Sequence, residues 1–253
     1  MAADPILFDE AEPIATITLN RPEKLNALSI PAWDRLKASL EAADNNEDIR
    51  VIILRGAGDA FSSGDDIGDF EVETAGEARR YARHILDCGL TIERIETPVI
   101  AAVDGLAFGG GCELAALPDV TIATEEATFR LPEAQVGAVP GLGLVRFPEL
   151  IGIKATRELM LGQRVLSATE AQDIGLVNEV VAPAELDEVV TERAETIAAS
   201  APMSIRLIKR VLNSRLADEA AAVNALTLVF SMEDSTEGME AFFEDRDPVW
   251  QDN

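Results

Sequence analysis

Two glutamates, each next to a stretch of glycines, are the residues of this sequence best suited to catalysis. Glu113 follows the run Gly109–Cys112, and Glu133 follows Leu131–Pro132 and leads into a second glycine-bearing stretch at 137–141. Because glycine lacks a Cβ, a ligand can approach the main chain beside these carboxyl groups closely. A bare backbone beside paired carboxyl groups suits carbonyl chemistry that includes proton transfer.

The glycines at 109–111 stand where an apolar strand gives way to a helix. The first N–H groups of a helix have no partner inside it and lie at the positive end of its dipole, so they suit an oxyanion. The spacing matches neither G-x-G-x-x-G nor G-x-x-x-x-G-K-[ST], so a nucleotide phosphate loop is not indicated. Close helix packing is the alternative explanation of the glycines, and a charge in the first turn of a helix is the alternative for each glutamate.

A second glycine-bearing loop lies upstream. The apolar strand Val51–Leu54 is followed by the segment Arg55–Ile67, which contains Gly64, Asp65 and Asp66. Two strand-to-loop junctions can each direct one N–H at a single carbonyl oxygen, and loss of one such donor costs about 10²-fold to 10³-fold in rate. The two loops together predict an oxyanion hole with two donors.

Four motifs in a fixed order give the sequence a family resemblance: Ala60–Ile67, Pro98–Gly105, Gly109–Ala115 and Pro132–Gly141. The chain resembles the enoyl-CoA hydratase (crotonase) family. Further matching segments extend the resemblance over nearly the whole chain, and they lie at 19–28, 168–177 and 237–246.

The resemblance implies roles for particular residues. It places the oxyanion hole at the N–H groups of Asp65 and Gly110, and it makes Glu113 and Glu133 the catalytic acid and base. It implies a coenzyme A thioester as substrate, with coenzyme A as part of the substrate, no separate cofactor and no metal. The expected substrate contacts are Ser63, Asp65, Asp66, Ile67, Gly68, Gly110 and Gly141.

The sequence departs from the family pattern around this site. Asp65 stands where the family often has a small apolar residue, and Gly141–Leu144 reads Gly-Leu-Gly-Leu where many relatives continue with Gly-Gly-Thr. The closing motif commonly carries lysines for the coenzyme A phosphates, whereas only Arg246 is basic here. Other candidate phosphate contacts are Lys24, Arg55, Arg79, Arg80 and Arg83. An exposed surface position is the alternative for Lys24 and for the three arginines at 79–83.

Three functions are compatible with these residues: an enoyl-CoA hydratase, an enoyl-CoA isomerase, and an acyl-CoA-binding member without activity. One carboxylate is enough to move a proton along an allylic system, whereas water addition uses a base and an acid. Retention of both Glu113 and Glu133 favours the hydratase. A protein without activity is expected to have lost one of them.

The composition is strongly acidic. Asp and Glu number 46 against 21 Lys and Arg, which gives a formal charge of −25 and a sequence pI near 4.3. The acidic residues are spread along the chain, so they indicate a broadly acidic surface and disfavour nucleic-acid binding. A halophilic cytoplasm would explain this excess, because salt screens the repulsion between like charges.

No secretory signal or membrane segment is recognised in the sequence, so a cytoplasmic enzyme is expected. Cys88 and Cys112 are far apart and form no C-x-x-C motif, so neither a disulfide framework nor a zinc site is indicated. His84 is the only histidine and no Ser or Cys nucleophile motif accompanies it, which disfavours a hydrolase triad.

Alternating apolar strands and helices predict an α/β fold. Strands are expected at 14–19, 51–54, 99–103 and 120–123, and helices at 31–43, 75–96 and 110–117. The resemblance implies a spiral of ββα units over residues 1–190, which holds the active site. Amphipathic spacing predicts helices at 186–199, 204–217, 219–231 and 236–243. By analogy, region 191–253 is expected to assemble homotrimers or hexamers, although packing within one chain would explain the same spacing.

Overall fold

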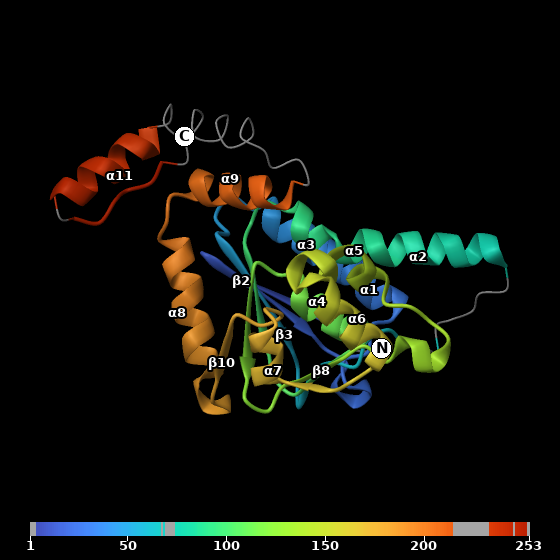
Figure 1. The fold of residues 1–253 in the computed structure, drawn as a ribbon. Coiled ribbons are helices and arrows are strands. Elements are labelled where there is room, and N and C mark those ends of the chain that lie inside the picture. The colour runs from blue at the N-terminus through green and yellow to red at the C-terminus, as the bar shows by residue number, and fades with distance from the viewer. Residues whose placement is uncertain (1–3, 67, 69–73, 215–232, 245, 252–253) are drawn as a thin grey trace.

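The computed structural model describes residues 4–66, 68, 74–214, 233–244 and 246–251. These residues form two β-sheets that are covered by helices, so the expected α/β class is confirmed (Figure 1). Within the described ranges, no helix is both long enough and apolar enough to span a membrane.

The larger sheet has six strands in the order β1-β2-β3-β5-β7-β10. β1 and β2 are antiparallel, and the other neighbours are parallel. β5 is buried at every position, as a continuous apolar run in a parallel sheet covered on both faces should be. The strand bounds are β1 Ile6–Ala11, β2 Ile14–Leu19, β3 Val51–Gly56, β5 Val99–Val103, β7 Val120–Thr124 and β10 Glu179–Val181.

The smaller sheet has the order β4-β6-β8-β9, and its first three strands are parallel. Its strands are β4 Ala60–Ser62, β6 Leu106–Phe108, β8 Thr128–Arg130 and β9 Leu166–Ser167. The chain passes three times from the large sheet to the small sheet and then into a helix, as β3-β4-α2, β5-β6-α4 and β7-β8-α5. This repetition confirms the spiral of ββα units.

The early helices follow the predicted ranges with one difference. α1, Ile30–Asp44, begins where Ser29 caps it by accepting the Ala32 N–H. The single helix expected at 75–96 is wrong, because it is divided into α2, Ala75–Gly89, and α3, Thr91–Arg94. A Cβ on Gly89 would lie 2.5 Å from the Leu142 side chain, so this glycine permits close packing where the helix is interrupted.

Only some of the remaining helices pack on the two sheets, and the last one lies apart from them (Figure 1). α4 spans Gly110–Ala116 and begins at the predicted residue. α8 and α9 match the helices expected at 186–199 and 204–217, with α9 ending at Asn213, and α11 covers the one expected at 236–243. The helix expected at 219–231 lies outside the described residues. The other bounds are α5 Gly141–Leu150, α6 Gly152–Gly162, α7 Ala168–Asp173, α8 Leu186–Ala198, α9 Pro202–Asn213 and α11 Glu233–Glu244.

The domain boundary expected at residue 190 falls inside α8. Leu186, Val190 and Ala194 of this helix are buried in one apolar cluster with residues of β3, β5 and β7. Figure 1 shows α8 running along one side of the large sheet. The division into a catalytic region and an assembly region stays a prediction.

A buried lysine links α9 to the large sheet through a hydrogen bond and an ion pair. Lys209 Nζ donates to the Thr97 carbonyl at 2.9 Å and pairs with Asp119 Oδ2 at 2.8 Å. The same Asp119 oxygen accepts the Val99 N–H at 2.8 Å. Burial lowers the pKa of the Lys209 amine, and the charge of Asp119 opposes that change. The ion pair therefore holds α9 against the start of β5.

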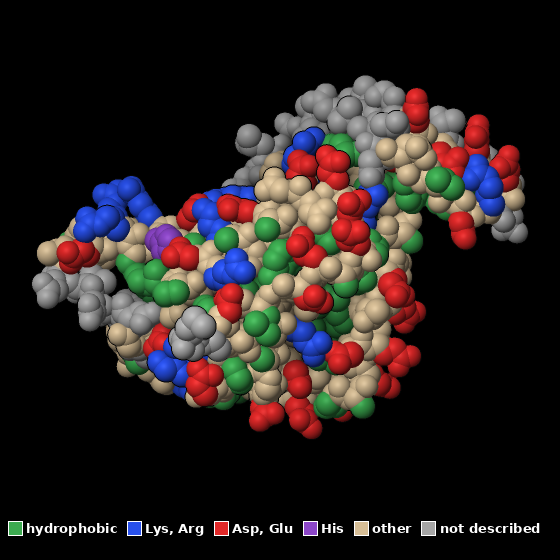
Figure 2. All heavy atoms as spheres, turned by 180° about the vertical axis from the view of Figure 1, so that it is seen from behind, with side chains coloured by type: hydrophobic (Ala, Val, Ile, Leu, Met, Phe, Trp, Pro, Cys, Tyr) green, Lys and Arg blue, Asp and Glu red, His purple; other side chains and the backbone are tan. Residues whose placement is uncertain are grey.

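The acidic residues are distributed over the surface. Figure 2 shows Asp and Glu side chains scattered across the face seen from behind, over several elements. A charge of −25 spread in this way repels itself in dilute buffer.

Raising KCl from about 0.1 M to about 2 M is therefore expected to raise the melting temperature by at least about 4 °C, since 1 to 2 kcal/mol produces a shift of this size in a chain of this length. At 1 M salt the Debye length falls to about 3 Å, which screens the repulsion. Thermal melts followed by circular dichroism provide the measurement. Equal melting temperatures at both concentrations would contradict this expectation.

Candidate active site

The three segments expected to form the site follow three neighbouring strands of the small sheet. Asp65 comes after β4, Gly110 after β6 and Glu133 after β8. β4 pairs with β6 and β6 pairs with β8, in both cases in parallel. Since parallel strands end at the same edge of a sheet, the topology brings these segments together although they lie far apart in the sequence.

Two backbone N–H groups meet at this edge. A Cβ on Gly64 would lie 2.7 Å from the Phe108 carbonyl oxygen and 3.0 Å from the Gly110 nitrogen, so only glycine allows the two loops to approach this closely. The N–H groups of Asp65 and Gly110 have no hydrogen bond within the described part of the chain. Both expected oxyanion donors are thus close together and available.

Asp65 is held with its N–H turned away from the neighbouring chain. The Leu28 N–H donates to the Gly64 carbonyl at 2.8 Å, and the Asp66 N–H donates to the Leu28 carbonyl at 3.0 Å. In a parallel bridge, Leu28 bonds to Gly64 and Asp66, the residues on either side of Asp65. The N–H of Asp65 itself therefore points away from Leu28. The local pairing with Leu28 therefore presents the Asp65 N–H to the site.

Glu113 lies in the first turn of α4 and is only 4% exposed. Its Oε1 accepts the Gly143 N–H at 2.6 Å, and the Leu142 N–H also hydrogen-bonds its carboxyl group. Burial raises the pKa of Glu113 well above its ordinary value, and the charges of Glu133 and Asp65 raise it further. The two N–H groups oppose this shift, because they stabilise the ionised carboxylate.

Gly143 is a site residue that the sequence did not reveal. A Cβ at this position would lie 2.9 Å from Met160 Cε and 3.2 Å from Glu113 Oε1, so a side chain would disturb the bond that holds the carboxylate. The segment Gly141–Leu144 was recognised only as a departure from the family pattern. Its alternating glycines were the signal that α5 comes close to another group.

Glu133 begins a short 3₁₀ helix, η3 Glu133–Val136, just after β8. Both of its carboxyl oxygens are buried and accept no hydrogen bond from another described residue. Oε1 lies 3.3 Å from the position that a Cβ would take on Gly109. Burial raises the pKa of Glu133, its own backbone N–H opposes this shift, and the charge of Asp65 adds to it. The carboxyl group is thus placed beside the glycine loop with its oxygens free for a ligand.

Asp65 contributes a third carboxyl group beside the two glutamates. Its Oδ1 accepts the Trp33 Nε1–H at 2.8 Å, and its Oδ2 lies 3.0 Å from the position of a Cβ on Gly110. Burial raises the pKa of Asp65, and the bond from Trp33 opposes that shift. An ionisable group therefore lies beside the two N–H groups that would bind an oxyanion.

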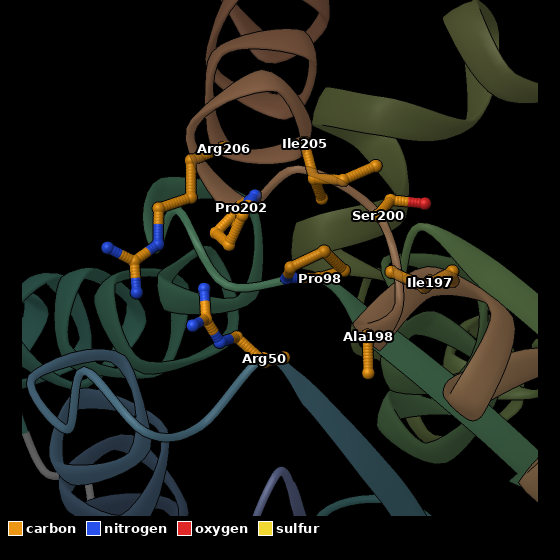
Figure 3. Close-up of a pocket in the computed structure, with 8 residues that line it drawn as sticks. All are labelled: Arg50, Pro98, Ile197, Ala198, Ser200, Pro202, Ile205 and Arg206. Carbon is orange, nitrogen blue, oxygen red and sulfur yellow. The ribbon is translucent and has the colours of Figure 1, made fainter. Parts of the chain in front are cut away.

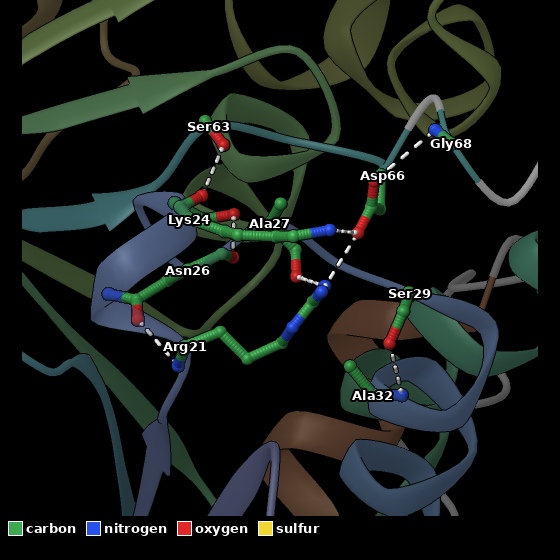
Figure 4. Close-up of polar contacts among 10 residues, drawn as sticks. Arg21, Lys24, Asn26, Ala27, Ser29, Ala32, Ser63, Asp66 and Gly68 are labelled. Carbon is green, nitrogen blue, oxygen red and sulfur yellow. Dashed lines mark hydrogen bonds and ion pairs between the residues drawn. The ribbon is translucent and has the colours of Figure 1, made fainter. Parts of the chain in front are cut away.

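The other expected substrate contacts lie around this centre. Figure 4 shows the Asp66 carboxylate between Arg21 and Lys24, at 2.9 Å and 3.1 Å, and the Ser63 hydroxyl pointing to the Lys24 carbonyl. The Gly68 N–H donates to Asp66 Oδ1 at 3.2 Å. Asp66 and Ser63 are therefore engaged in holding their own loop. Ile67 lies outside the described residues.

Gly141 begins α5, two residues before the N–H group that binds Glu113. A Cβ on this glycine would lie 3.8 Å from the Leu86 side chain of α2, which is ordinary contact. Gly141 thus lies where α2 and the start of α5 meet, next to the segment that holds the carboxylate.

Several candidate phosphate contacts are paired with carboxylates. Arg55 pairs with Asp187 at 2.9 Å, and Arg246 pairs with Glu237 at 2.6 Å. Lys24 is paired with Asp66, as described above. On α2, Arg80 approaches Glu77 at 3.9 Å, and exposed side chains are found at Arg79 and Arg83.

A small hollow lies elsewhere in the molecule. It is lined by Arg50, Pro98, Pro202 and Arg206, among others, and Figure 3 shows both guanidinium groups on the same side of it. Arg50 and Pro98 precede the amino ends of β3 and β5. The two glutamates instead lie beyond the carboxyl ends of strands, so this hollow is separate from the site that they form.

Known proteins resemble this chain over its full length. Residues 9–253 match the family model described as enoyl-CoA hydratase/isomerase. A crotonyl-CoA hydratase from Syntrophomonas wolfei is 37% identical, with 97% of each chain covered. A short-chain-enoyl-CoA hydratase from Clostridium acetobutylicum is 34% identical, also with 97% of each chain covered.

Solved structures agree with these relatives. An enoyl-CoA hydratase from Bacillus anthracis superimposes with a TM-score of 0.92 at 33% identity, and the match covers 98% of this chain and 100% of the other. An enoyl-CoA hydratase subunit from Geobacillus kaustophilus gives a TM-score of 0.91 at 36% identity, with 98% of each chain covered. This chain belongs to the enoyl-CoA hydratase/isomerase family.

Proposed function

We propose that this protein is an enoyl-CoA hydratase, which adds water across the 2,3 double bond of a 2-enoyl-CoA to give a 3-hydroxyacyl-CoA. The observation that carries the proposal is the pair of buried carboxyl groups, Glu113 and Glu133, beside two free N–H groups at one sheet edge. The full-length relatives whose names specify enoyl-CoA hydration support the same reaction.

The first task of the site is to polarise the thioester. When the N–H groups of Asp65 and Gly110 donate to the thioester oxygen, the β-carbon becomes electrophilic. Negative charge builds on that oxygen as water attacks. Donors that are already oriented stabilise this charge without reorganising, which is why they lower the barrier.

The two carboxyl groups divide the proton transfers. We assign Glu113 mainly to the water, because the N–H groups of Gly143 and Leu142 hold its carboxyl group in place and favour the ionised form against the effect of burial. We assign Glu133 mainly to the α-carbon, because its oxygens lie beside the glycine loop and accept no hydrogen bond from another described residue. The two groups titrate as a coupled pair.

The proposal has further parts. Coenzyme A enters only as part of the substrate, and the carboxyl pair and the backbone supply the chemistry. We propose that the bound thioester is bordered by Gly68, Gly141 and the segment from Ser63 to Ile67. We also propose that the protein forms a homotrimer or hexamer, that it is located in the cytoplasm and that it is adapted to high salt, as the sequence leads us to expect.

An absorbance assay of the conjugated thioester band tests the function. In concentrated KCl, crotonyl-CoA should lose its conjugated band on addition of the protein, because hydration removes the double bond. If the band appears with a 3-enoyl-CoA but is not lost with crotonyl-CoA, the protein is an isomerase and the proposed hydratase activity is wrong. If the absorbance does not change with either thioester although both bind tightly, the protein is a family member that binds acyl-CoA without catalysis.

Asp65→Asn is expected to shift both limbs of the pH profile of kcat/KM to lower pH and to raise its maximum roughly tenfold. The charge of Asp65 raises the pKa of Glu113 and of Glu133, so its removal lowers both values. The ionised side chain also faces the position where the oxyanion forms. Measurement of kcat/KM against pH with crotonyl-CoA checks this.

Asp59→Asn is the matched control, because Asp59 is an exposed carboxylate in the turn between β3 and β4. This variant loses the same charge at a distance from the carboxyl pair and should keep the profile of the unchanged protein. If Asp65→Asn also keeps that profile, its carboxyl group has no electrostatic influence on the site.

A further inference from the structure

Three metal-binding side chains of different chemistry meet between α1 and α2. Asp34 lies on α1, and His84 and Cys88 lie one turn apart on α2. His84 Nε2 is 2.9 Å from Asp34 Oδ1 and 3.9 Å from Cys88 Sγ, and the three ligand atoms all lie within 4.8 Å of one another. The sequence did not indicate this group, because its members come from two helices and match no metal-binding motif.

The spacing suits one ion with a tetrahedral shell. Zinc binds sulfur at about 2.3 Å and nitrogen or oxygen at about 2.0 to 2.2 Å, so its ligand atoms lie about 3.3 to 3.6 Å apart. The distances of 2.9 Å and 3.9 Å bracket that range, and the Asp34 and Cys88 ligand atoms lie within 4.8 Å of each other, so side-chain rotations would be needed to bring all three atoms around one ion. A thiol, an imidazole and a carboxylate favour zinc-like ions, whereas Mg²⁺ and Ca²⁺ prefer oxygen ligands alone.

Two of the three side chains are open to solvent. Asp34 and His84 have side chains that are 57% and 40% exposed, whereas Cys88 is fully buried. An ion can therefore reach the carboxylate and the imidazole from solvent, and a rotation of the Cys88 side chain would bring its sulfur to the ion. A water would complete a tetrahedral shell as the fourth ligand. The high negative charge of the protein attracts cations toward the surface in general.

The charges around the cluster are mixed. Lys37 and Asp87 form an ion pair beside it, and Glu41 lies 3.8 Å from the Lys37 amine. Burial raises the pKa of the Cys88 thiol to about 11, with the charge of Asp34 adding to the shift and that of Lys37 opposing it. The thiol is therefore protonated in the absence of an ion, and binding releases its proton.

We propose that Asp34, His84 and Cys88 bind one divalent ion of the zinc class and so cross-link α1 to α2. The second helix of this pair carries Leu86, which lies against Gly141 at the start of α5. An ion here would therefore restrain a helix that borders the candidate active site. The proposal rests on this cluster alone and does not depend on the reaction that the protein catalyses.

Cobalt(II) is the probe for this site, because a thiolate ligand gives it a charge-transfer band in the near ultraviolet. Untagged full-length protein should give that band with one equivalent of Co²⁺, and Zn²⁺ should abolish it by displacement. Zn²⁺ should also raise the melting temperature, since an ion that binds only the folded state stabilises it. Mg²⁺ should have neither effect.

Two ligand variants and one control variant test the site. Cys88→Ser should lose the band, whereas Cys112→Ser, the matched change at the other thiol, should keep it. His84→Gln should weaken Co²⁺ binding by more than about 100-fold, since loss of a direct ligand exceeds the effect of losing a supporting residue. His84 is partly exposed, so this variant should fold even if Cys88→Ser does not.

Absence of the band from the unchanged protein would overturn the proposal, and so would an equal band from Cys88→Ser. Equal Co²⁺ affinity for His84→Gln would also overturn it. None of these results bears on the hydratase assay, so failure of the metal site and failure of the proposed function can be told apart.

Discussion

Glu133→Gln is expected to lower kcat for the hydration of crotonyl-CoA by at least about 100-fold, the scale of general acid–base catalysis. Glutamine has nearly the same shape but cannot exchange the proton that the α-carbon requires. No hydrogen bond to another described residue is lost, because neither carboxyl oxygen accepts one. Steady-state kinetics at saturating thioester provide the measurement.

The same variant should not lose stability at pH 8. Burial raises the pKa of Glu133 in the folded state, so its favourable contribution to folding is present below the unfolded pKa and is lost as pH rises through the folded value. A neutral glutamine avoids the cost of ionising a buried group. Its melting temperature should therefore equal or exceed that of the unchanged protein, and thioester affinity should change little.

Glu126→Gln is the matched control, since Glu126 is exposed in the turn between β7 and β8 and should retain full turnover. Near-normal turnover by Glu133→Gln would remove Glu133 from the mechanism. A large loss of turnover with an equally large loss of stability would make its role structural.

Glu113→Gln is expected to reduce hydration by about 10³-fold or more, but to reduce any isomerisation of a 3-enoyl-CoA by less than about tenfold. The amide oxygen of glutamine can still accept the Gly143 N–H, so the start of α5 should keep its position. The amide cannot take a proton from water. Parallel assays with crotonyl-CoA and a 3-enoyl-CoA separate the two reactions.

The ratio of the two losses is the informative quantity for this variant. Equal losses would mean that both carboxyl groups serve both proton transfers, which contradicts the assignment of the water to Glu113. A comparison with Glu133→Gln in the same assays completes the argument, because that variant should lose isomerisation at least as severely as hydration.

The sequence predicted the parts of the fold that have strong local signals. Strands such as β5 are continuous apolar runs, and α1 begins at a serine cap followed by a proline, so their ranges could be read directly. The short strands β4, β6 and β8 were missed, because three residues are too few to show a period. These strands nevertheless align the loops of the site.

The candidate catalytic residues were predicted mainly through the order of the motifs. Their physical surroundings could not be predicted, because they depend on contacts between segments far apart in the chain. The Gly143 N–H reaches Glu113 across 30 positions, and Trp33 reaches Asp65 across 32. No pattern in the local sequence predicts that buried Trp33 donates a hydrogen bond to the Asp65 carboxylate beside the oxyanion donors.

The ion pair between α9 and the large sheet has a consequence for how the protein is made. Asp119 and the Thr97 carbonyl lie beside the start of β5. Their partner Lys209 follows Asp119 by about 90 residues and Thr97 by 112 residues. At 5 to 20 residues per second, about 5 to 18 s pass on the ribosome between Asp119 and Lys209. During that interval the aspartate lacks its buried cation, so the sheet reaches its final stability only after residue 209 has been added.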